Sequence, residues 1–359
     1  MYSRSLFFAL LTPALVANAY EPRTDLEAGR YLKALGEAEA RLKANSNNAL
    51  AWAAKSQALS AMQRFGEALA SAEQALRIQP NLADAYLARG LARAGTAVQQ
   101  RNFSSLRNAS GALDDLEQAT RLDGRLTTAW MSLGLAYEQL PGLLGGSTRK
   151  ALACAAQLRA VNGPKGDLLQ GMVLAMASRW SEAEPFFQRA LSQAPGDPEI
   201  VYGYLDSLGS REARKRLGDA EQKRRQAQEA RRLYPSVCRS AKALEAITDA
   251  LLDAGQGEEA WSVAKGALAQ VDAPSLLRLQ LGKLAARSGL HLDEGLAYLD
   301  QAVREPLEGG SGGLPSAHWR RGQILKALGR AAEARAAAQT ALRFDPRHPG
   351  AKKLLEELG

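Results

Sequence analysis

Large apolar residues and small residues recur along this chain in the same order about every 34 residues, from residue 49 onwards. Two helices of about 14 residues, with short turns between them, occupy roughly that length. Small residues let such helices approach closely, large residues fill the space beside them, and a proline ends the second helix. No run of alternating β-branched residues is found in the sequence, so the pattern predicts an all-α fold.

The clearest copy opens with Trp130, Leu133, Gly134 and Tyr137. A helix pair of this kind cannot bury its apolar face alone, so the copies are expected to stack on one another. The 34-residue spacing of the pattern is interrupted at 95–111, 139–148 and 203–225. Other copies keep the same phase at Trp52, Ala68, Ala75 and Pro80, at Ala112 and Ala119, at Gly171, Ala183, Phe187, Ala190 and Pro195, and at Gly322, Ala334, Ala341 and Pro346.

This series resembles the tetratricopeptide repeat family. The resemblance implies a right-handed α-solenoid of about seven to nine helix pairs, which acts by presenting a surface to a partner. We expect the superhelix to cover residues 20–348, with two arrays hinged near 203–225 as the alternative. Residues 349–359 combine one apolar stripe with one charged face, which predicts a C-terminal capping helix.

The first 19 residues have the pattern of a secretory signal peptide. Arg4 supplies a positive charge, an apolar stretch follows from Leu6 to Ala17, and Ala17-Asn18-Ala19 fits a cleavage site after Ala19. The alanine- and arginine-rich composition is typical of a bacterial chain. We therefore expect a protein that is periplasmic or secreted, and soluble after cleavage. An uncleaved membrane anchor is the alternative.

The formal charge of +8 comes largely from residues 211–232, which form a basic, helix-like run. Such a run is either a solvated second helix or a contact for an anionic surface. Nucleic acid is not expected, because no aromatic residues interleave the bases. Cys154 and Cys238 lie more than two repeats apart, so we expect two free thiols rather than a disulfide.

The resemblance also implies which residues face the concave groove, because the fifth and ninth positions of each first helix usually do. The predicted groove is apolar through the middle repeats and acidic beyond them, which would suit a protein or peptide segment with apolar and basic residues. The alternative for the apolar members is ordinary core packing, whereas the carboxylates are expected to face solvent. The predicted groove residues are Leu87, Leu91, Met131, Leu135, Leu168, Met172, Tyr202, Asp206, Glu245, Asp249 and Trp319.

No catalytic, metal-binding or cofactor-binding motif appears, and the three histidines are isolated. The insert Pro141–Ser147 is either a functional loop or a folded-back connection. The sequence thus predicts a non-enzymatic protein- or peptide-binding scaffold of the bacterial cell envelope. Alternatives are a small-molecule or hydrophobic-ligand binder associated with an envelope transporter, and an assembly factor for a surface polymer or outer-membrane complex.

Overall fold

The computed structural model describes residues 25–26, 30–100, 103–271, 273–304 and 313–359. Helices and short turns make up these residues, and no strand occurs among them, as the hydrophobic pattern predicts. The predicted signal peptide, residues 1–19, lies outside the described residues. No helix in the described ranges is both long enough and apolar enough to cross a membrane.

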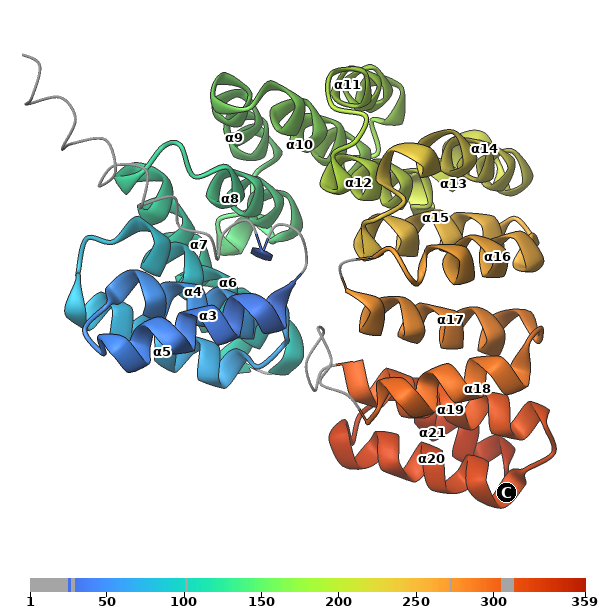
Figure 1. Ribbon diagram of the computed structural model, residues 1–359. Helices are drawn as coiled ribbons and strands as arrows, with labels where there is room; N and C mark the ends of the chain where they lie inside the picture. Colours follow the sequence, from blue (N-terminus) through green and yellow to red (C-terminus); the bar gives the residue numbers. More distant parts are fainter. Residues whose placement is uncertain (1–24, 27–29, 101–102, 272, 305–312) are drawn as a thin grey trace, which may run out of the picture.

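Successive helices pack as antiparallel pairs, and each pair stacks on the next (Figure 1). Helix α3 (Tyr31–Ala44) precedes the first pair, and α21 (Pro349–Glu357) follows the last at the predicted capping position. The pairs are α4 (Ala49–Ala61) with α5 (Phe65–Ile78), α6 (Ala83–Gln100) with α7 (Phe103–Leu122), α8 (Thr127–Gln139) with α9 (Thr148–Val161), α10 (Gly163–Met176) with α11 (Trp180–Gln193), α12 (Pro198–Leu208) with α13 (Arg211–Leu217) and α14 (Asp219–Val237), α15 (Ala241–Asp253) with α16 (Gly257–Ala267), α17 (Pro274–Ser288) with α18 (Leu292–Ala302), and α19 (Leu314–Ala327) with α20 (Ala331–Phe344).

The residues that define the repeat pattern lie in the packing between helices. A side chain added at Gly134 would meet Leu169, and one added at Gly282 would meet Leu299, so both glycines mark close helix contacts. Tyr137 is buried. The indole N–H of Trp130 donates to the Gly124 carbonyl oxygen at 2.8 Å, so this tryptophan ties its helix to the preceding turn. The Trp130 motif therefore serves the stack, as predicted.

The three interruptions of the pattern have different structures. The extra residues around 95–111 lengthen α6 and α7, which have 18 and 20 residues. The insert within 139–148 contains a short 3-10 helix, η1 (Gly142–Leu144), on which Leu143 is 97% exposed. The basic run is not one long helix. It divides into α13 and α14 at Gly218, whose φ of 84° is a left-handed conformation that glycine adopts readily.

The stack curves until its two ends face one another, with the N-terminal pairs opposite the C-terminal ones (Figure 1). The Arg347 guanidinium donates to the Gln99 carbonyl oxygen at 3.0 Å, across 248 residues of sequence. The two cysteines are free, with Cys154 buried and Cys238 partly exposed, which confirms the prediction of unpaired thiols.

Candidate peptide-binding groove

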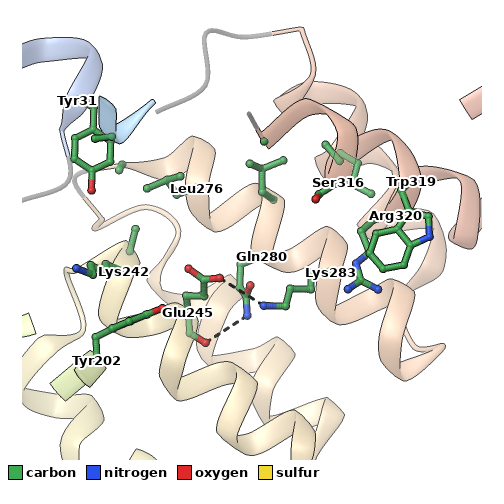
Figure 2. Close-up of a pocket in the computed structure, with 17 residues that line it drawn as sticks. Tyr31, Tyr202, Lys242, Glu245, Leu276, Gln280, Lys283, Ser316, Trp319 and Arg320 are labelled. Atoms are coloured by element: carbon green, nitrogen blue, oxygen red, sulfur yellow. Dashed lines mark hydrogen bonds and ion pairs between the residues drawn. The ribbon is translucent and has the colours of Figure 1, made fainter. Parts of the chain in front are cut away.

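A cavity of about 470 Å³ lies on the inner face of the superhelix, against the first helices of three consecutive pairs, α15, α17 and α19. Figure 2 shows Lys242 and Tyr202 on one side of this cavity and Trp319 and Arg320 on the other. Tyr31 of α3 and Ala61 of α4 reach it from the N-terminal end of the chain. The cavity therefore depends on the curvature of the whole stack, not on one repeat.

The floor of the cavity is apolar. Leu276 and Leu279 of α17 line it, together with Ala273, Ala317 and the buried Leu299. Polar groups surround this floor, and among them the Ser316 side chain is exposed to solvent. An apolar floor with a polar rim is typical of sites that hold apolar side chains of a partner while exchanging hydrogen bonds at the edge.

The carboxylates of α15 are paired with bases of α17. Asp249 lies 2.6 Å from the Lys283 ammonium and 3.8 Å from the Arg287 guanidinium, and it accepts a hydrogen bond from the Gln280 amide at 3.0 Å. Glu245 lies 3.5 Å from the same Lys283 ammonium (Figure 2). Two of the three carboxylates predicted to face the groove are therefore paired with bases at neighbouring repeat positions.

Asp206 of α12 differs from the other two predicted carboxylates. Its side chain is exposed on the inner face and forms no ion pair with the described residues. Desolvation by the surrounding walls raises the pKa of its carboxyl above the usual value. It lines a smaller cavity of about 160 Å³ together with three further carboxylates, those of Glu245, Asp249 and Asp253. Lys283 and Arg287 of α17 pair with these three, and Asp206 is left without an ion pair among the described residues.

Two bases at the rim of the main cavity, Lys242 and Arg320, form no ion pair within the described part of the chain. The Arg320 guanidinium lies 3.9 Å from the centre of the Trp319 ring and donates to the Gln323 amide oxygen at 2.8 Å. Burial lowers the pKa of Arg320 to about 10, and the nearby Arg287 adds to the effect. The Lys242 ammonium lies 5.1 Å from the centre of the Tyr202 ring.

The predicted groove residues divide into four groups, which line three cavities or pack between helices. Tyr202, Glu245 and Trp319 line the main cavity, and Leu87 and Leu91 line a second cavity of about 210 Å³ that shares Tyr31, Ala61 and Lys242 with it. Asp206 and Asp249 line the smaller acidic cavity. The remaining four residues belong to the packing between helices. Met131 and Leu168 are buried, and Leu135 and Met172 are partly buried. For these four, the structure agrees with the alternative of ordinary core packing.

Sequence reasoning missed Lys242, Leu276, Ser316, Gln280 and Arg320. The first three occupy the second position of their repeats and the other two the sixth position, whereas only the fifth and ninth positions were considered. Residues three and four apart share one face of a helix. Extending the fifth and ninth positions by one helical turn would have found them. Tyr31 lies before the first recognised repeat, and no periodic signal marks it.

The basic run at 211–232 is largely neutralised. Arg225 pairs with Glu184, Arg231 with Glu259 at 2.6 Å, and Lys223 with Asp219 at 2.7 Å. Arg211, Lys215 and Arg216 of α13 are exposed and form no ion pair with described residues. This arrangement agrees with a solvated helix and leaves only the short α13 as a contact for an anionic surface.

The fold defines an α-solenoid of paired helices, and comparison with known proteins identifies the repeat. Three models of the tetratricopeptide repeat match residues 49–82, 145–198 and 315–348. The chain belongs to the tetratricopeptide repeat family. Proteins of this family are generally protein-interaction scaffolds, and the repeat is typically non-enzymatic. The search of curated proteins found no match.

Three of the solved structures of similar fold are compared with this chain by sequence identity, coverage and TM-score. A thermophilic tetratricopeptide repeat protein of Thermus thermophilus is 24% identical over 51% of this chain and 92% of its own, with a TM-score of 0.45. Yeast Tom70 is 12% identical over 94% of this chain and 80% of its own, with a TM-score of 0.47. Pseudomonas aeruginosa pilF is 15% identical over 66% of this chain and its full length, with a TM-score of 0.43.

Proposed function

We propose that this protein is a non-enzymatic scaffold that binds an extended segment of another protein on its inner face. The observation that supports the proposal most directly is the cavity of about 470 Å³ against α15, α17 and α19. It combines an apolar floor with aromatic and charged groups at its rim, and it lies on a face that an extended chain can follow. Stacked repeats present such grooves as their main recognition surface.

A displayed library of random peptides tests the proposal. Peptides are selected on the immobilised protein and then compared on two variants. Ser316→Trp fills the cavity from an exposed position, whereas Ala336→Trp adds the same side chain to an exposed position of α20, outside every cavity described above. We expect selected peptides to lose binding to Ser316→Trp and to keep it to Ala336→Trp. Selection of no peptide with this dependence would overturn the proposal.

A small apolar ligand is the second candidate, because the volume of the main cavity lies within the range of about 300–1,000 Å³ found for ligand sites. Native mass spectrometry of the protein purified from its own host separates the two candidates. A retained mass that disappears in Ser316→Trp supports the small ligand. A spectrum of the bare protein, together with groove-dependent peptides, supports the segment.

We further propose that the protein works in the bacterial envelope after export and cleavage. The signal-like residues 1–19 support this proposal. Expression of the full chain in a bacterium, followed by fractionation and mass spectrometry of the amino terminus, tests it. We expect a periplasmic or secreted product that begins at Tyr20. A cytoplasmic product that retains residues 1–19 would contradict it.

A further inference from the structure

We propose that the segment bound in the groove carries two acidic side chains on either side of apolar residues, one for Lys242 and one for Arg320. This inference rests on the proposed function and specifies the chemistry of the partner. It replaces, for this cavity, the expectation of a basic partner, which followed from reading Asp206, Glu245 and Asp249 as free carboxylates; Asp206 lines the neighbouring smaller cavity.

The ion pairs around the cavity support an acidic rather than a basic partner segment. Asp249 and Glu245 share Lys283 at 2.6 and 3.5 Å, and Arg287 lies 3.8 Å from Asp249, so both carboxylates already have basic partners within the protein. Lys242 and Arg320 are the lining bases that form no ion pair with the described residues; the Asp249 carboxylate acts on Arg320 only at longer range. The charge that remains for a partner at this cavity is therefore positive, at its two ends.

The Arg320 guanidinium is held in one orientation before a partner binds, unlike that of a freely solvated surface arginine. The guanidinium is stacked on Trp319 at 3.9 Å and oriented by its hydrogen bond to Gln323. Its surroundings already reduce its hydration, and burial of a charge without a partner is unfavourable. A carboxylate at this place would form charge-assisted hydrogen bonds with donors whose orientation is fixed before binding.

The spacing of the two bases sets the spacing of the acidic residues. Lys242 lies on α15 and Arg320 on α19, with α17 between them. Packed helices are roughly 8–10 Å apart, so two spacings amount to roughly 16–20 Å. An extended chain advances about 3.3 Å per residue, which places the two acidic side chains about five or six positions apart. Leu276 and Leu279 lie between the bases and would contact the intervening apolar side chains.

An internal segment fits this arrangement better than a chain terminus, because a terminal carboxylate supplies one charge at one end. The probe is a fluorescein-labelled peptide with both termini blocked. It has two glutamates about five residues apart and leucine and phenylalanine between them. Matched peptides carry glutamine or lysine in place of both glutamates, and a fourth has a single free carboxylate at its C-terminus.

Fluorescence anisotropy with the full chain measures the affinity for each peptide. We expect the glutamate peptide to bind about tenfold or more tightly than the glutamine peptide, and the lysine peptide to bind least. Arg320→Gln and Lys242→Gln should each remove much of that preference, whereas the matched control Lys352→Gln, an exposed base on α21, should leave it unchanged. The affinity should also fall with added salt.

Charge reversal separates recognition from damage to the fold. The double variant Lys242→Glu, Arg320→Glu should prefer the lysine peptide. Equal binding of glutamate and glutamine peptides, a preference for lysine, or tightest binding of the free C-terminus by the unaltered protein would overturn the inference. If Ser316→Trp still abolishes binding in those cases, the proposed function stands and only the partner chemistry fails.

Discussion

At the scale of single residues, the sequence predicts packing more accurately than binding. The packing role of Gly134 and Gly282 could be predicted, because two helices in close contact leave room only for a small residue. The pairing of Asp249 with Lys283 was also within reach, since both occupy the ninth position of adjacent repeats. The stacking of Arg320 on Trp319 was not, because it depends on side-chain rotamers that no spacing specifies.

Close helix contact at Gly282 gives the first prediction. A methyl group there would lie 2.3 Å from Leu299, which is buried, so Gly282→Ala should lower the free energy of unfolding by about 1–3 kcal/mol. Gly36 in α3 is the matched control, because an added methyl group meets nothing within 4 Å. Gly36→Ala should raise stability by up to about 1 kcal/mol. Urea unfolding followed by circular dichroism measures both, and equal effects would contradict the packing described for α17 and α18.

The two thiols should differ in reactivity. Burial raises the pKa of Cys154 to about 12, and the thiolate is the reactive form, so this residue should remain almost unreactive near pH 8. Cys238 is only partly buried. A thiol-specific chromogenic reagent should therefore detect one fast thiol in the folded protein and two after unfolding. The Cys238→Ser variant assigns the fast reaction, and a fast thiol that persists in this variant would contradict the burial of Cys154.

At the scale of helices, the boundaries of the regular repeats could be predicted because proline and the small residues fix them. Residues 49–82 and 315–348 each contain one helix pair with a short turn. The division of the basic run at Gly218 was not predicted, because the charge pattern is helical on both sides. The cap was predicted from its amphipathic pattern, and Leu354 on α21 packs over Gly322 of α19.

The cap gives the prediction at this scale. Leu354 is 3% exposed, so Leu354→Ala should lower the stability of the last pair by about 2 kcal/mol or more. Lys352→Ala changes an exposed neighbour and should alter stability by no more than about 0.5 kcal/mol. Hydrogen exchange should rise in α19 and α20 of the first variant and stay unchanged in α4 and α5, because repeats contact only their neighbours. Uniform loss of protection along the chain would contradict this description.

At the scale of the whole molecule, the candidate site arises from curvature. Each repeat adds a small rotation, and their sum brings Tyr31 to the same cavity as Trp319 and Leu276 (Figure 2). A local sequence pattern does not specify the total curvature of the stack. The sequence therefore predicted an inner face, but not which repeats surround the cavity. The middle repeats, where Met131 and Met172 were expected to bind, supply packing, and the main cavity lies in the C-terminal half.

The measurement that tests the central claim most directly is site-specific photocrosslinking of a selected peptide. A benzophenone amino acid replaces Ser316 on the inner face or, in the matched control, Ala336 on α20. Irradiation with the peptide should give a covalent adduct from position 316 and none from position 336. Adducts of equal yield from both positions, or from position 336 alone, would contradict binding on the inner face.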